Sequence, residues 1–138
     1  TVLDISGAAL GRARGRLGLQ AEKLQWVESD ILAFKPKRPY TLWHDRATFH
    51  FLTSPEQVAR YLACAREGIP YGGYLILGTF SDTGPDTCSG LPVQRYSISA
   101  LQKALAPYFE MKEGVNLPHY TPSGGRQDYT FGVFVHSG

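Results

Sequence analysis

Residues 54–80 read SPEQVARYLACAREGIPYGGYLILGTF, and this stretch decides the fold class. Ser54 can cap a helix, the proline after it fits the first helical position, and Gln57 completes a capping box. Apolar residues then recur at helical spacing up to Gly68, where the helix is expected to end. The run at residues 74–80 is nearly all apolar, which is typical of a strand covered on both faces. The stretch therefore predicts a helix followed by a buried strand.

Strand and helix patterns alternate along the rest of the chain. Further helices are predicted between Ser6 and Gly18 and over residues 97–105, and residues 81–96 form a long loop of the kind that is often functional. The other predicted strands are residues 1–5, 24–30, 40–44, 109–115 and 127–136. This order predicts an α/β fold, a mostly parallel sheet covered on both faces, with an antiparallel C-terminal hairpin at or near one edge. Residues 127–136 are predicted to pair antiparallel beside residues 74–80.

The composition narrows the class of protein. The chain has 138 residues, 43% of them hydrophobic, so we expect one domain over residues 1–138 with a substantial core. A net charge of +2 gives no electrostatic argument for nucleic acid. No apolar run approaches the roughly 20 residues that cross a bilayer, and no signal peptide pattern is present, so we expect a soluble protein without a membrane partner.

The cysteines and histidines give no metal motif. Cys64 and Cys88 lack a metal-type spacing, which suggests reduced thiols in a cytoplasmic setting. No HExxH or CxxC motif occurs, so no metal site is expected.

Three acids follow predicted strands: Asp4, Asp30 and Asp45. In open α/β sheets, ligands bind beyond the carboxyl ends of the strands. A single carboxylate there is often only a helix cap, whereas three along one edge favour a polar ligand site. The residues alone leave both interpretations open.

Several stretches resemble a bacterial branch of class I S-adenosylmethionine-dependent methyltransferases. They are VLDIS at residues 2–6, WHDRATFHFL at 43–52, CSGLPVQRY at 88–96 and HYTP at 119–122. The resemblance extends over essentially the whole chain. It implies a three-layer, Rossmann-like methyltransferase sandwich with the strand order 3-2-1-4-5-7-6, and S-adenosylmethionine as cofactor. It implies a transferase that moves a methyl group to an acceptor. Small molecules, protein side chains and thiols are all open as the acceptor.

The resemblance also assigns roles to residues at the cofactor's adenosine end. Asp4 accepts hydrogen bonds from the ribose hydroxyls, and Ile5 packs on the adenine face. A carboxylate suits two vicinal hydroxyl donors because it offers two acceptor oxygens. Asp30 accepts from the adenine amine, and Ile31 lies beside the ring.

At the reacting end, the resemblance places Asp45 and Arg46 beside the methionine part of the cofactor and the acceptor pocket. A plain structural ion pair between Asp45 and Arg46 is an equal alternative. His50 is the candidate catalytic histidine that would help to deprotonate an acceptor, with His44 and His119 as other possibilities. A lone histidine is more often structural. The region around residues 88–96 and 119–127 would shape the acceptor pocket.

One departure from the family affects every expectation about function. The family's first strand, its glycine-rich turn and the next helix should precede Thr1, and no such glycine pattern occurs in these residues. We therefore expect a truncated domain with poor or undetectable cofactor affinity. We also expect a homodimer with the strand that begins at Thr1 at or near the interface, because the strands at residues 1–5 and 40–44 lose a neighbour.

Two functions stay open at this point. The first is an N-terminally incomplete methyltransferase, inactive or active as this chain. The second is a non-catalytic oligomeric remnant of the fold that acts as a binding module. A nicotinamide-binding domain is disfavoured, because it too needs the glycine turn and because residues 43–52 match the methyltransferases.

Overall fold

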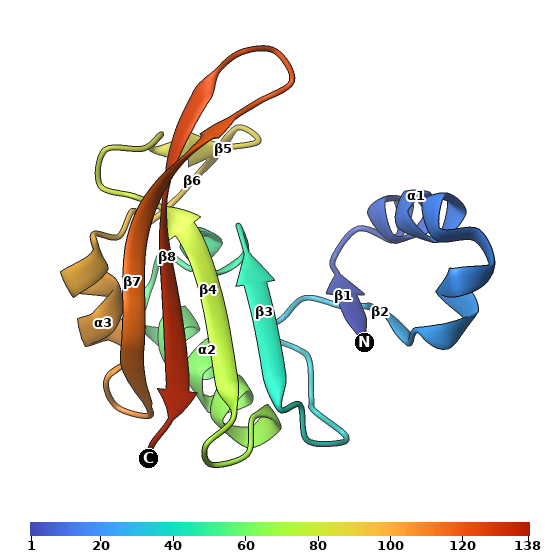
Figure 1. The fold of residues 1–138 in the computed structure, drawn as a ribbon, viewed down its shortest axis with the longest axis horizontal. Coiled ribbons are helices and arrows are strands. Elements are labelled where there is room, and N and C mark those ends of the chain that lie inside the picture. The colour runs from blue at the N-terminus through green and yellow to red at the C-terminus, as the bar shows by residue number, and fades with distance from the viewer. The chain divides into compact units, whose positions relative to one another are not determined.

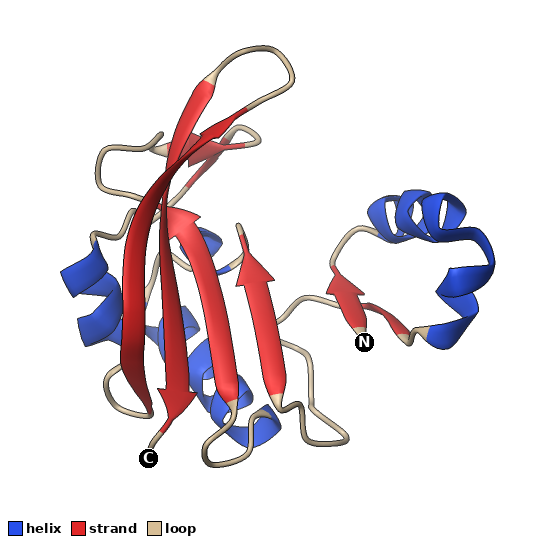
Figure 2. Ribbon diagram, in the orientation of Figure 1, coloured by secondary structure: helices blue, strands red, loops and turns tan.

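A computed structural model describes all residues from Thr1 to Gly138, and the chain folds into two compact units (Figure 1). The first unit comprises residues 1–35 and the second residues 36–138. Each unit has its own sheet and its own helices (Figure 2).

The smaller unit is a β-α-β arrangement. Strand β1 (Val2–Asp4) leads into helix α1 (Gly7–Leu17), the 3-10 helix η1 (Gly18–Lys23) and strand β2 (Trp26–Glu28). β1 and β2 pair in parallel, so their carboxyl ends lie at one edge. Ser6 caps α1 by accepting a 3.1 Å hydrogen bond from the Ala9 amide, and Gly18 ends it with a φ of 56°. The predicted helix is confirmed, and the strand predicted at residues 24–30 is shorter, because pairing with β1 begins only at Trp26.

The larger unit contains a four-stranded sheet in the order β3-β4-β8-β7. The strands are β3 (Leu42–Arg46), β4 (Tyr74–Phe80), β8 (Arg126–His136) and β7 (Phe109–Tyr120). β3 and β4 are parallel, while β8 runs antiparallel to both β4 and β7. The predicted pairing of residues 127–136 beside residues 74–80 is confirmed, and β4 lies inside the sheet. In the family's numbering, β2 and β1 correspond to strands 3 and 2, and β3, β4, β8 and β7 correspond to strands 4, 5, 7 and 6. Within each unit the observed strand order is therefore the one that the resemblance implied.

Local signals position the helices of this unit. Helix α2 (Pro55–Gly68) begins with the predicted capping box: Ser54 Oγ accepts from the Gln57 amide, and Gln57 Oε1 accepts from the Ser54 amide, each at 3.2 Å. Helix α3 (Ile98–Leu105) is capped by Ser97 in the same way as α1. A short 3-10 helix, η2 (Phe49–Phe51), precedes α2.

Helices α2 and α3 lie on one face of the four-stranded sheet (Figures 1 and 2). The core between them and the sheet contains fully buried apolar side chains: Leu75, Leu77, Leu101, Leu105 and Phe134. Burial of each such side chain contributes about 1.5–3 kcal/mol.

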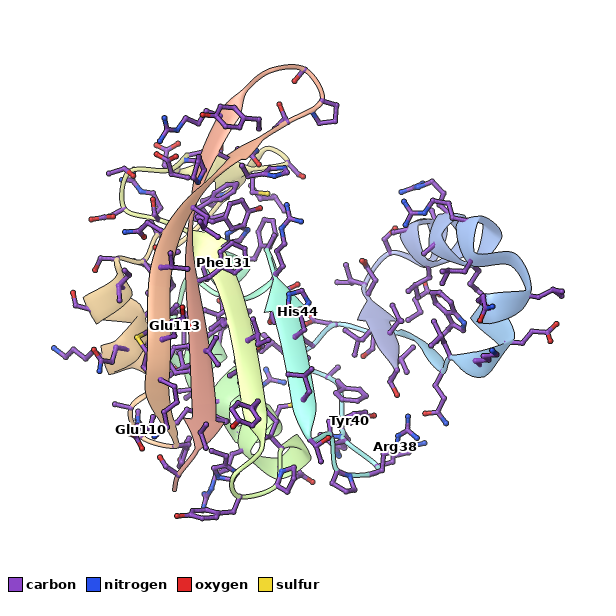
Figure 3. All side chains as sticks on the ribbon, in the orientation of Figure 1. Arg38, Tyr40, His44, Glu110, Glu113 and Phe131 are labelled. Carbon is purple, nitrogen blue, oxygen red and sulfur yellow. The ribbon has the colours of Figure 1, made fainter.

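The opposite face of this sheet is covered by no helix of its own unit, and we call it the open face. Its central side chains come from alternate positions of β4 and β8, because successive strand residues point to opposite faces. They are Tyr74, Ile76, Phe131, Val133 and Val135, and all are half-buried or exposed (Figure 3). The second helix layer of the expected three-layer sandwich therefore stays a prediction.

The structure differs from the predicted elements in three further places. β3 starts and ends two residues later than the strand predicted at residues 40–44, so Asp45 lies inside the strand. β7 runs on to Tyr120 because β8 pairs with it along its whole length. The loop at residues 81–96 contains the two-residue strands β5 (Thr87–Cys88) and β6 (Leu91–Pro92).

Candidate functional site

The acids of the smaller unit lie at the carboxyl ends of β1 and β2. Asp4 is half-buried, and its Oδ1 accepts a 2.8 Å hydrogen bond from the Ser6 amide. Asp30 is exposed, and its Oδ1 accepts at 2.9 Å from the Leu32 amide. Each carboxylate therefore stabilises the turn that follows it through one oxygen. The second oxygen, Oδ2, makes no hydrogen bond in the structure and is available to a ligand.

The isoleucines next to these acids differ in exposure. Ile5 follows Asp4 directly and is 70% exposed, and several other large apolar side chains of this chain are exposed as well. Ile31 follows Asp30 and is buried. An exposed apolar side chain beside a carboxylate with an unused oxygen is suited to a flat ring that carries polar groups.

Asp45 lies in the larger unit, on the helix side of β3. It is 7% exposed, and its Oδ2 accepts a 2.6 Å hydrogen bond from the hydroxyl of Tyr61, which is fully buried on α2. Its Oδ1 has no hydrogen-bond partner of standard geometry. Burial raises the pKa of this carboxyl group, and the Tyr61 hydroxyl and nearby backbone amides oppose that shift.

Arg46 points the other way, onto the open face. Its guanidinium carbon lies 5.2 Å from the centroid of the Tyr129 ring, and its Nη2 lies 3.5 Å from Nε2 of His119. Neighbouring residues of a strand face opposite sides, so Arg46 does not pair with Asp45. The structural ion pair that the sequence left as an alternative is thus not formed.

His50 lies on η2 and is fully buried. Its Nδ1 accepts a 3.1 Å hydrogen bond from the Phe80 amide, which assigns the ring proton of the neutral form to Nε2. Nε2 has no hydrogen-bond partner. Burial lowers the pKa of His50 to about 4, so the ring is neutral at pH 7.

The long loop at residues 81–96 returns across the carboxyl ends of β3 and β4. The Gln94 amide donates to the His50 carbonyl at 2.8 Å, and the Tyr96 amide donates to the Phe80 carbonyl at 3.0 Å. Thr130 of β8 fixes the end of the loop by donating to the Tyr96 carbonyl at 2.6 Å. The loop therefore closes over His50 at the edge of the sheet where ligands bind in α/β folds.

Sequence reasoning missed two residues of this arrangement. Tyr61 fitted the apolar stripe of its helix, and nothing in that pattern revealed that its hydroxyl reaches Asp45. Tyr129 fitted the alternation of its strand, and its contact with Arg46 spans a large separation in sequence. The structure brings together Arg46, His119 and Tyr129, and it places His44 on the same face of β3 as Arg46.

The side chains form no metal-binding cluster, and the helices have no membrane-spanning character. No group of three or more His, Cys, Asp or Glu residues lies close enough together to hold a metal ion, and both cysteines are free thiols. None of the helices has the length and apolar character needed to cross a membrane.

The fold of the chain is similar to those of solved methyltransferases. The N-methyltransferase NodS from Bradyrhizobium japonicum WM9 superimposes with a TM-score of 0.73 and 20% identity, over 99% of this chain and 72% of that chain. The 1,6-didemethyltoxoflavin-N1-methyltransferase of Burkholderia thailandensis, solved with bound 1,6-didemethyltoxoflavin and S-adenosylhomocysteine, has a TM-score of 0.76 and 16% identity. That match covers 99% of this chain and 60% of that chain.

A third similar structure is the glycopeptide N-methyltransferase MtfA in complex with S-adenosylmethionine. It has a TM-score of 0.71 and 14% identity, over 99% of this chain and 71% of that chain. No protein-family model and no curated protein matches the chain. At these identities the likeness establishes the fold alone, which is an α/β methyltransferase-like fold.

Proposed function

We propose that this chain is an S-adenosylmethionine-dependent methyltransferase domain. The likeness of fold supports the proposal, and the observation that carries it is the hydrogen bonding of the Asp4 carboxylate. Its carboxylate stands at the end of β1 with Oδ1 bound to the Ser6 amide and Oδ2 unused. A carboxylate in this position can accept from the ribose hydroxyls of the cofactor without disturbing its own turn.

The residues of the smaller unit fit the adenosine end of the cofactor. Asp30 has an unused oxygen that can accept from the exocyclic amine of adenine, and Ile5 offers an exposed apolar surface for the ring. Ile31 would support the ring from within the unit. When bound, S-adenosylmethionine supplies an electrophilic methyl group on a sulfonium.

The residues of the larger unit have different roles. Asp45 is held by Tyr61, so we assign it the role of fixing the end of β3. His50 has its Nδ1 occupied by the Phe80 amide and its pKa lowered to about 4, which favours a structural role over proton abstraction. Arg46 and His119 lie close together on the open face, and we assign them to binding of the methyl acceptor.

The proposal is tested by an NMR titration of the 15N-labelled chain with S-adenosylhomocysteine and, separately, with NAD⁺. NMR shifts detect binding even at millimolar dissociation constants. We expect saturable shifts of the amides around Asp4 and Asp30 with S-adenosylhomocysteine and none with NAD⁺. Equal responses to both, or no response to either, would contradict the proposal.

The alternative function, a non-catalytic binding module, is distinguished by a methyl-transfer assay. Such a module would bind S-adenosylhomocysteine in the titration but would transfer no methyl group from S-adenosylmethionine to an acceptor.

A further inference from the structure

Arg46 is a cation without an acidic partner at the end of a strand. It is exposed, and its contacts are the Tyr129 ring at 5.2 Å and His119 Nε2 at 3.5 Å. The ring and the imidazole fix the guanidinium but do not neutralise it. Arginine carries five N–H donors in a planar fork, so most of its donors stay available to a ligand.

The neighbouring carboxylates are engaged elsewhere. Asp45 faces the other side of the sheet, where Tyr61 holds it. Asp128 of β8 accepts a 2.7 Å hydrogen bond from Nε of Arg126 and a second bond from Thr83. The positive charge of Arg46 is therefore not balanced by an acid of its own unit.

Apolar side chains of β7 and β8 continue on the open face from the Tyr129 ring that contacts this cation. Tyr129 stacks on Phe131 with centroids 5.5 Å apart and ring planes 19° apart. Leu117 pairs with Tyr129 and Val115 with Phe131, and they are 48% and 38% exposed. The β7–β8 hairpin thus presents an apolar wall next to the Tyr129 ring on which the Arg46 guanidinium lies. Figure 3 labels Phe131 of this wall.

We propose that Arg46 binds a carboxylate group of the methyl acceptor, whose apolar or aromatic body lies against the wall of Phe131, Val115 and Leu117. Naming this ligand the methyl acceptor rests on the proposed function, whereas the carboxylate site itself does not. A planar guanidinium binds a carboxylate through two parallel N–H···O bonds, and the cation–π contact holds its plane in place. The acceptor class is therefore a small aromatic or apolar carboxylate.

The experiment uses benzoate, its neutral analogue benzamide, and acetate, each titrated into the 15N-labelled 138-residue chain without cofactor. Shifts are followed at the Arg46 side-chain N–H and at the Phe131 and Val115 amides. We expect benzoate to bind about tenfold or more tightly than benzamide, which lacks the charge, and than acetate, which lacks the apolar body. Equal affinity for benzoate and benzamide, or no shift at millimolar benzoate, overturns the proposal. A response to acetate equal to that to benzoate overturns the apolar part of it.

Two variants and one control assign the binding to this residue. Arg46→Ala should abolish the preference for benzoate, and Arg46→Lys should keep part of it, because lysine retains the charge and loses the fork. Arg66→Ala is the matched control: Arg66 lies 4.7 Å over Tyr108, next to the opposite end of β7, and its loss should leave benzoate binding unchanged. Unchanged benzoate binding in Arg46→Ala contradicts the assignment.

The titration also separates this inference from the proposed function. Benzoate binding through Arg46 without any S-adenosylhomocysteine response supports the carboxylate site and contradicts the methyltransferase. The reverse result supports the methyltransferase and contradicts the acceptor class.

Discussion

The hydroxyl of Tyr61 donates a 2.6 Å hydrogen bond to Oδ2 of Asp45, and both side chains are buried where α2 meets β3. Burial raises the pKa of Asp45, which the Tyr61 hydroxyl opposes, and burial together with the Asp45 carboxylate raises the pKa of Tyr61 well above its ordinary value, so the phenol is neutral at pH 7 and is the donor of this bond. The Tyr61–Asp45 hydrogen bond fixes the end of β3, where the side chain of the next residue, Arg46, points to the open face.

Removing this hydroxyl should destabilise the chain. Tyr61→Phe leaves a buried carboxylate without its strongest donor, so we expect the free energy of unfolding to fall by about 1–3 kcal/mol at pH 7. The loss should be smaller below pH 3.8, the ordinary pKa of the carboxyl group, where Asp45 is protonated in both states. Denaturant unfolding measures both values, with Tyr71→Phe as a control because Tyr71 is 80% exposed. An equal loss in the two variants would contradict this role for the bond.

His50 should make the fold sensitive to acid. Its folded-state pKa of about 4 lies below the unfolded value of 6.5, so its contribution to stability is complete above pH 6.5 and is lost as the pH falls toward 4. We expect a loss of about 2–3 kcal/mol across this interval. In His50→Asn, whose Oδ1 can still accept from the Phe80 amide, this part of the pH dependence should disappear. Identical pH profiles for the two chains would show that His50 does not titrate in this way.

Gly78 should resist substitution because of the aromatic wall. A Cβ at this position of β4 would collide with the Phe131 ring, so Gly78→Ala should destabilise by about 1–3 kcal/mol. Gly15 of α1 has no atom within 4 Å of an added Cβ, so Gly15→Ala should stabilise by about 0.5–1 kcal/mol. Thermal unfolding compares the two variants. A stabilising Gly78→Ala would mean that Phe131 does not lie over β4.

The free strand edges of β1 and β3 lead us to propose that the 138-residue chain is a homodimer with the strand that begins at Thr1 at or near the interface. β1 and β3 each pair with a strand on one side only. Light scattering at micromolar concentration should give the mass of a dimer. Leu3→Pro removes a backbone donor from the free edge of β1, because the Val2 amide is the one that donates to β2, and should shift the mass toward the monomer, whereas Gln102→Lys on the exposed side of α3 should not. A monomeric wild-type chain would contradict the proposal.

The sequence predicted the elements whose signals are local. The capping box at Ser54 and Gln57 is complete within four residues, and the alternation along β8 reflects a strand with one buried face. By contrast, the strand predicted at residues 109–115 is only the first part of β7, which continues to Tyr120 although Gly114 and Pro118 are residue types that disfavour strands. The partner strand overrides those preferences, since Pro118 pairs with Asp128 inside a continuous hairpin.

The site was predictable only in part, for a related reason. Asp4 and Asp30 could be placed because strand ends in a β-α-β unit meet at one edge. The contacts of Arg46 depend on which face of β3 it occupies and on how far the β7–β8 hairpin extends, and neither is encoded near Arg46. The contact of Tyr61 is likewise not encoded locally, because its hydroxyl reaches Asp45 only after α2 packs on the sheet.

The most direct test of the central claim is a titration of S-adenosylhomocysteine into Asp4→Ala beside the unmodified chain. Glu22→Ala, which removes an exposed acid of η1 in the same unit, serves as the control. If Asp4 accepts from the ribose hydroxyls, the variant should lose about 1.5–3 kcal/mol of binding free energy, a drop in affinity of about tenfold to a hundredfold, while the control binds as before. An Asp4→Ala chain that titrates like the unmodified one would contradict the claim.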